Sequence, residues 1–229
     1  NGYNFTAKNA VPFFPSGMPG GSLLAFMSAK ETHGCICFLI ANARPDQSVQ
    51  ISCFTYDLEE ISRAIMLARS KRVRVTMCCD HRTTLGQQTR EQLNRIIALR
   101  AVGVQIYLVA GLDIRLEYAA VSRSVRPGFG ILHQKTVMVG RHFIVGSTNF
   151  TTSSRNNHEI SALLWLHPEG ATVYQQKYDE LKSSGEILSD ASIEEAEIRR
   201  EHQRTAKEAG RSQSRGRHTA TSSGSTSLR

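Results

Sequence analysis

The sequence predicts an α/β protein with a mixed, largely parallel β-sheet and helices on both of its faces. Residues 48–54 alternate between polar and apolar and are β-prone, and residues 73–79 form an apolar stretch that also predicts a strand. Between them, Ile61, Ile65 and Ala68 recur at helical spacing. Because a helix that connects two strands usually leaves those strands parallel, this strand–helix–strand unit indicates a parallel pair.

The elements on either side of this unit follow the same alternation. Asp57 and Glu60 are spaced as a capping box and are expected to open the helix that follows them. Residues 35–43 are the most apolar stretch, too short to span a bilayer, and are expected to form a buried strand. The other predicted elements are helices at 89–100 and 172–183, and strands at 104–109, 131–139, 142–145 and 160–166.

Composition divides the chain into three segments. Residues 1–22 are rich in Gly, Pro and Asn and are expected to form an irregular arm. Residues 23–188 carry the α/β pattern and are expected to form one folded domain. Residues 189–229 form a charged tail that is helix-prone to about residue 210 and rich in Ser, Thr, Arg and Gly beyond it, so we expect most of it to be disordered.

The formal charge of +8 does not by itself identify a ligand for the folded domain. Residues 199–229 hold eight Lys/Arg and two Asp/Glu, so +6 of the excess lies in the tail. We expect the tail to contact a polyanion only weakly. A long polar loop at 111–130 adds Arg115, Arg123 and Arg126, which are further candidates for polyanion contact.

The cysteines do not predict a disulfide framework or a metal site. There are five of them, an odd number, without regular spacing. Cys35, Cys37 and His33 could supply half of a zinc site, but no second pair follows at ligand spacing. We therefore expect no metal and no cofactor, and reduced cysteines buried in strands.

The residues with the clearest chemical content lie between 133 and 159. Side chains at i and i+2 of a strand point to the same face, so we expect His133 and Lys135 to project together. The tight turn at 140–141 then returns the chain and delivers Ser147 and Asn149, two short side chains that can donate hydrogen bonds to an oxyanion. These four residues together predict a phosphate site.

This set of side chains suits nucleophilic attack on a phosphodiester. A neutral imidazole, such as that of His133, is a competent nucleophile, and attack would give a phosphohistidine that water then resolves. Lys135, Ser147 and Asn149 would stabilise the charge that develops on the phosphate oxygens. Glu159 is expected to bind the far nitrogen of His133 and fix its tautomer.

The pattern His133-x-Lys135 followed by Gly146-Ser147-x-Asn149 resembles the signature of the phospholipase D superfamily. The resemblance covers roughly residues 48–183. Within the superfamily, the chain resembles the branch with one signature per chain, which includes bacterial endonucleases and mitochondrial cardiolipin hydrolases. It implies that residues 23–188 are a catalytic domain for metal-independent phosphodiester hydrolysis. It also implies a homodimer in which two copies share one site and the second His133 protonates the leaving group.

The chain departs from the family pattern at one turn. Family members usually carry an aspartate after the lysine, whereas here Val139 runs directly into Gly140 and Arg141. This departure motivates an alternative, in which the domain binds phosphate-containing ligands or dimerises without turnover.

Substrate and location stay open at this stage. Nucleic acid is the expected substrate ahead of phospholipid, because the sequence shows no clear apolar rim or membrane anchor. Intracellular location is favoured, and the resemblance also admits mitochondria. The chain begins at Asn1, so a targeting segment or anchor before it would be missing.

Overall fold

A computed structural model of the chain describes residues 11–12, 20–86, 90–113 and 129–219. Contacts divide the chain into two units, Asn1–Leu188 and Ser189–Arg229, which are described separately. Arg115, Arg123 and Arg126 lie outside the described residues, as do residues 1–10 and 13–19 of the expected arm.

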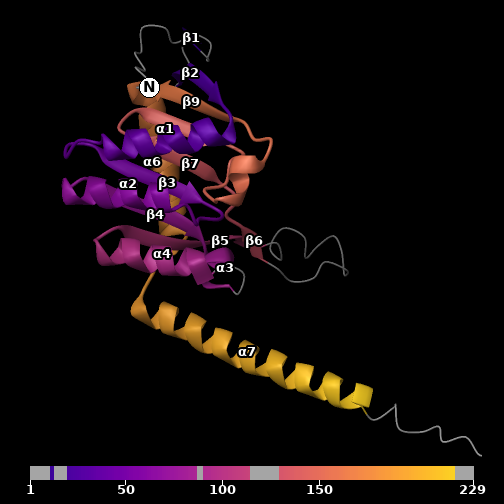
Figure 1. The fold of residues 1–229 in the computed structure, drawn as a ribbon. Coiled ribbons are helices and arrows are strands. Elements are labelled where there is room, and N and C mark those ends of the chain that lie inside the picture. Colours follow the sequence, from indigo (N-terminus) through magenta and orange to yellow (C-terminus); the bar gives the residue numbers. More distant parts are fainter. Residues whose placement is uncertain (1–10, 13–19, 87–89, 114–128, 220–229) are drawn as a thin grey trace, which may run out of the picture. The chain divides into compact units, whose positions relative to one another are not determined.

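The first unit is an α/β layer structure (Figure 1). Its helices are α1 (Ala29–Ala41), α2 (Glu59–Ser70), α3 (His81–Leu85), α4 (Arg90–Ala101), the short 3-10 helix η2 (Ser153–Asn156) and α6 (Pro168–Ser183). Its strands are β1 (Val11–Pro12), β2 (Gly21–Met27), β3 (Ser48–Cys53), β4 (Arg74–Asp80), β5 (Gln105–Asp113), β6 (Phe129–Ile131), β7 (Lys135–Val139), β8 (His142–Gly146), β9 (Ser161–Leu166) and β10 (Glu186–Ile187).

Within the described part of the chain these strands form one sheet in the order β1-β2-β9-β8-β7-β3-β4-β5-β10, with β6 paired to β5. Helices α1, α2 and α4 cover one face, and α6 lies on the other (Figure 1). The predicted α/β class, with a mixed sheet and helices on both faces, is confirmed.

The proportion of parallel pairs corrects one detail of the prediction. Parallel pairing joins β3 to β4 and β4 to β5, whereas the other pairs among the described strands are antiparallel. Only the βαβ crossovers place strands in parallel, while β7 returns directly into β8 through the two-residue turn Gly140–Arg141. Parallel pairs are therefore confined to the centre of the sheet.

Residues 35–43 are not a strand, because most of them lie in helix α1. Its first turn carries a capping box in which the Glu31 carboxylate accepts the backbone N–H of Ser28 over 2.8 Å. Ile36 and Ile40, four residues apart, are both fully buried on one face. A buried helix and a buried strand are equally apolar over so short a stretch, and the cap that distinguishes them, at Ser28, lies seven residues before Cys35.

The core has a separate apolar layer on each side of the sheet. On the helix-rich side, α1, α2 and α4 bury isoleucines and leucines such as Ile36, Ile65 and Leu93. On the other side, Tyr178 of α6 packs with Cys78 and neighbouring residues. The Tyr178 hydroxyl lies within hydrogen-bond distance of a backbone carbonyl in β3 and another in β4 and shares its proton between them, which ties α6 to both parallel strands.

The second unit consists of helix α7 (Asp190–Thr219) and the residues that follow it. We expected residues 211–229 to be disordered, but α7 continues through residue 219. Among the described residues, no helix is long and apolar enough to cross a membrane.

Candidate functional site

Five strand ends meet at one edge of the sheet and bring the predicted residues together. The pairing of Cys53 with Lys135 places the start of β7 beside the end of β3. The pairing of Gly146 with Ser161 places the end of β8 beside the start of β9. β4 ends at the same edge because it runs parallel to β3. The segments 133–135, 147–149 and 159 therefore emerge along one edge.

His133 does not lie in a strand. The predicted strand 131–139 is broken, because β6 ends at Ile131 and pairs with β5, and β7 begins only at Lys135. The strand-periodicity argument for His133 and Lys135 is therefore wrong, although both residues do meet at Phe54. The His133 ring packs edge-on against Phe54 with 4.9 Å between centroids, and Lys135 Nζ lies 5.3 Å from the centroid of the same ring.

Asp80, at the end of β4, fixes the backbone on which His133 depends. This carboxylate is 1% exposed; it accepts the backbone N–H of Leu132 over 2.8 Å and that of Thr83 over 2.8 Å. The Thr83 hydroxyl also donates to the carbonyl of Phe54 over 2.6 Å. The Asp80 carboxylate thus anchors the residue before His133, and the Thr83 hydroxyl anchors the backbone of Phe54, whose ring packs against His133. The sequence showed an acid at a strand end but not this role.

Lys135 is 5% exposed, an unusual position for an ammonium group. Its Nζ donates a hydrogen bond to the backbone carbonyl of His133 over 2.9 Å. Burial lowers the pKa of Lys135, and the carboxylate of Glu159 opposes that effect. The charge of Glu159 therefore acts on Lys135.

Glu159 shows no hydrogen bond to His133 among the described residues; its carboxylate accepts one from Asn157 Nδ2 over 3.3 Å. The tautomer-fixing role proposed for Glu159 stays a prediction.

Ser147 and Asn149 differ in solvent exposure and in the hydrogen bonds that they already make. Ser147 is exposed, its N–H donates to the carbonyl of Ile160 over 3.1 Å, and its hydroxyl accepts the N–H of Ile160 over 3.3 Å. Asn149 is partly buried, and its Oδ1 atom has no hydrogen-bond partner within the described part of the chain. A buried amide oxygen without a partner can accept a hydrogen bond from a ligand hydroxyl or a water, whereas the Nδ2 group of the same amide can donate to a phosphate oxygen.

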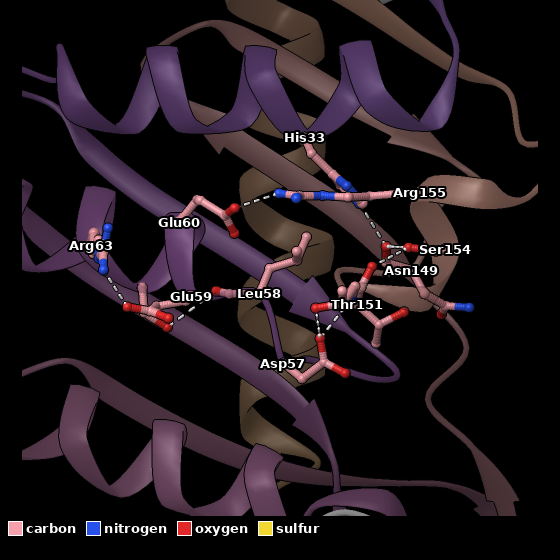
Figure 2. Close-up of polar contacts among 12 residues, drawn as sticks. His33, Asp57, Leu58, Glu59, Glu60, Arg63, Asn149, Thr151, Ser154 and Arg155 are labelled. Carbon is pink, nitrogen blue, oxygen red and sulfur yellow. Dashed lines mark hydrogen bonds and ion pairs between the residues drawn. The ribbon is translucent and has the colours of Figure 1, made fainter.

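A polar network behind Asn149 was not foreseen from the sequence (Figure 2). His33 Nε2, from helix α1, lies 2.9 Å from the Asn149 carbonyl oxygen, and the Ser154 hydroxyl donates to the same oxygen over 2.5 Å. The carbonyl of the next residue, Phe150, accepts the backbone N–H groups of Asp57 and Leu58. The Asn149 backbone is therefore held from three sides.

The predicted capping box at the start of α2 is wrong. The N-cap is Leu58, which makes no side-chain cap. The Asp57 carboxylate instead accepts the N–H of Thr152 over 2.7 Å, and Glu60 forms an ion pair with Arg155 at 2.8 Å (Figure 2). Both carboxylates therefore bind the segment that follows Asn149. These are tertiary contacts, which the spacing of Asp57 and Glu60 in the sequence could not reveal.

The turn without an aspartate lies at the opposite end of β7. Gly140 has a φ of +59°, and a Cβ built there would approach Gln47 Nε2 to 2.6 Å. This is a position that favours glycine. Lys135 and Gly140 stand at the two ends of the same strand, so the departure from the family pattern is remote from the site.

The described residues contain no group of three or more His, Cys, Asp or Glu able to hold a metal ion. His33 and Cys35 are buried in α1, and burial raises the pKa of Cys35 to about 11. Where the structure describes them, the five cysteines are free thiols.

Comparison with known proteins gives the family. A model described as "Cardiolipin synthase, PLD-like domain" matches residues 36–182, well over half of the chain. The chain therefore belongs to the phospholipase D superfamily, a family of phosphodiesterases. A search of curated proteins found no significant match.

Solved structures support the same fold. The Salmonella typhimurium phospholipase D family member Nuc matches with a TM-score of 0.57 and 18% identity, over 72% of this chain and 97% of that one. Helicobacter pylori NucT matches with a TM-score of 0.58 and 18% identity, over 72% and 98%. Haemophilus influenzae phosphatidylserine synthase matches with a TM-score of 0.52 and 13% identity, over 73% of this chain and 40% of that one.

Proposed function

We propose that this protein hydrolyses phosphodiesters without a metal ion, with His133 as the nucleophile. The observation that carries the proposal is the contact of His133 and Lys135 with one ring, Phe54, at the sheet edge where Ser147 and Asn149 also emerge. A nucleophile, a buried cation and two polar side chains at one edge suit a tetrahedral anion better than they suit a purely structural role.

The proposed reaction has two steps. A nitrogen of His133 attacks phosphorus, the bond to the leaving oxygen breaks, and a phosphohistidine forms. Water then attacks phosphorus, breaks the P–N bond and releases a phosphomonoester. Lys135, Ser147 and Asn149 stabilise the developing charge in both steps. Glu159 favours the charged form of Lys135 against burial, and its predicted role behind His133 belongs to the same proposal.

The missing aspartate does not count strongly against turnover. Gly140 lies five residues beyond Lys135, which at about 3.3 Å per residue puts it roughly 16 Å along the strand. A substitution at that distance acts on the turn rather than on the phosphate. The rival proposal, a domain that binds phosphate without turnover, therefore rests on the sequence pattern and not on a defect at the sheet edge.

The leaving group needs an acid, and the described unit offers one nucleophilic histidine beside Lys135. We propose that a second copy of the chain supplies it, so that two His133 residues face each other across a two-fold axis. The exposure of His133 is compatible with such a shared site.

Nucleic acid is the proposed substrate, and phospholipid is a second candidate favoured by one structural feature. Ile160, whose backbone is hydrogen-bonded to Ser147, is 62% exposed, and Phe26 on the neighbouring strand is also 62% exposed. An exposed isoleucine beside Ser147 offers apolar surface that suits acyl chains.

The test is turnover in EDTA on single-stranded DNA, RNA and cardiolipin vesicles. His133→Ala should abolish it, whereas His202→Ala, an exposed histidine in the other unit, should leave it unchanged. Turnover of none of the three substrates would favour the non-catalytic domain. Turnover that survives His133→Ala would refute the site assignment.

The shared site has its own test. Light scattering should give a dimer, and mixing inactive His133→Ala with inactive Lys135→Ala subunits should not restore activity, because each mixed site still lacks one histidine and one lysine. An active monomer would contradict the shared site.

A further inference from the structure

His33 connects helix α1 to the candidate site over 116 residues of sequence (Figure 2). It is 3% exposed, and its Nε2 lies 2.9 Å from the backbone oxygen of Asn149. Because a carbonyl oxygen only accepts, Nε2 carries the proton in the neutral ring, and Nδ1 is then the unprotonated nitrogen. Among the described residues Nδ1 has no hydrogen-bond partner.

This arrangement is costly if its purpose is packing alone. A buried polar atom without a partner destabilises the fold, and an apolar side chain of similar volume would avoid the cost. The Ser154 hydroxyl lies 2.5 Å from the Asn149 carbonyl oxygen and 2.7 Å from that of Thr151, and its single proton serves both. His33 is therefore the donor that is directed to the Asn149 carbonyl alone.

The orientation of the Asn149 peptide matters because the backbone of a residue sets the direction in which its side chain projects. The Asn149 carbonyl is held by His33 and Ser154, and the Phe150 carbonyl by the N–H groups that open α2. The Asn149 amide projects from this fixed peptide, with its Oδ1 buried and without a partner among the described residues. Because Oδ1 only accepts, the group of this amide that can donate to a phosphate oxygen is Nδ2. A donor that stabilises a transition state must be held in place before the reaction.

We propose that His33 is a positioning residue that fixes the Asn149 amide for contact with a bound phosphate group. The inference rests on the proposed function, since it assigns Asn149 a phosphate contact. His33 itself touches neither the reacting atoms nor the substrate, and it acts through the Asn149 backbone.

The decisive comparison uses two substitutions of different hydrogen-bonding capacity. His33→Gln keeps an N–H donor near the position of Nε2, and His33→Leu fills similar space without a donor. Thr32→Val is the matched control, because Thr32 is a buried polar residue on the same helix whose hydroxyl donates to the carbonyl of Ser28, the N-cap of that helix. Steady-state kinetics on the best substrate and thermal melting are measured for all four proteins.

We expect His33→Leu to lower kcat about tenfold or more with a smaller change in KM, because the lost contact is strongest in the transition state. His33→Gln should recover most of kcat, and Thr32→Val should leave it within about twofold. Equal kcat in all variants would overturn the proposal. A fall in kcat that follows the melting temperature in all three variants would also overturn it, because a merely structural role gives that result.

A second readout does not need turnover. The side-chain amide of Asn149 is followed by ¹⁵N NMR while inorganic phosphate is added. If the wild-type protein is inactive, the proposed function fails, but this NMR experiment still tests whether His33 positions Asn149. The proposal is supported if the Asn149 amide signal of His33→Leu differs from that of wild type and the signal of His33→Gln matches wild type again. An unchanged signal in His33→Leu refutes it.

Discussion

The buried carboxylate of Asp80 accepts the backbone N–H of Leu132 over 2.8 Å, one residue before His133. This bond joins the end of β4 to the start of the segment that carries the proposed nucleophile. The position of His133 therefore depends on a residue 53 positions away in the sequence, at the end of a different strand.

Asp80→Ala should destabilise the fold by about 3 kcal/mol, because two backbone donors lose a charged acceptor. Asp80→Asn retains one acceptor oxygen and should lose about half of that. Urea denaturation measures both values. Asp46→Ala removes an exposed aspartate and should leave stability close to that of wild type. Similar small losses at both positions would show that the Leu132 bond contributes little.

Phe54→Leu keeps an apolar side chain at this position but removes the aromatic ring, so it tests what the ring itself contributes to turnover. The His133 ring loses its edge-on partner and the Lys135 ammonium loses a cation–π contact, so we expect turnover to fall by about tenfold, consistent with 1–2 kcal/mol of lost interaction. The ring protons of His133 should also shift in NMR spectra as the ring current disappears. Phe143→Leu removes a ring that packs on Tyr174 instead and should leave the His133 signals in place.

Stability should depend on pH through His33. Burial lowers the pKa of His33 from 6.5, and the nearby Arg155 adds to that effect, while the bond to Asn149, Glu60 and Asp57 oppose it. The unfolded chain thus takes up a proton near pH 6.5, whereas the folded chain resists it until lower pH. The contribution of neutral, buried His33 to the free energy of unfolding is fully present above pH 6.5. It is lost as the pH falls below that value toward the pKa of His33 in the folded state.

Urea denaturation from pH 8 to 5 measures this dependence in wild type and in His33→Gln. The wild-type curve should fall more steeply below pH 6.5, by at most about 1.4 kcal/mol per pH unit for one proton. Parallel curves would show that His33 titrates equally in both states.

The ion pair between Glu60 and Arg155 should couple α2 to η2 measurably but weakly. The Arg155 guanidinium lowers the pKa of Glu60, and the two side chains are 49% and 36% exposed. A double-mutant cycle with Glu60→Gln and Arg155→Gln should give about 0.2–1 kcal/mol, less in about 0.5 M salt. The Glu59–Arg63 pair within α2 is the reference cycle. Zero coupling for Glu60–Arg155 alone would remove it as a tether of the Asn149 segment.

The sequence predicted those elements whose signal is local. The strand–helix–strand unit of β3, α2 and β4 followed from apolar periodicity, and the turn at Gly140 followed from its composition, which the positive φ bears out. Helix α1 was misjudged, because a nine-residue, mostly apolar stretch fits either state and the distinguishing cap lies outside it. The strand expected at 131–139 was misjudged because the partner of β6 is β5, which no local pattern reveals.

The sequence by itself determined the family, through the spacing of His133, Lys135, Ser147 and Asn149, and the chemistry that these side chains can perform. Tertiary structure alone decided what holds them. Phe54, Asp80 and His33 reach the site from three other elements, and each does so through a contact between residues far apart in the chain. Motif spacing records which groups are present. Orientation is set by buried hydrogen bonds and packing across the sheet edge, and these exist only once β3, β4 and α1 have assembled around it.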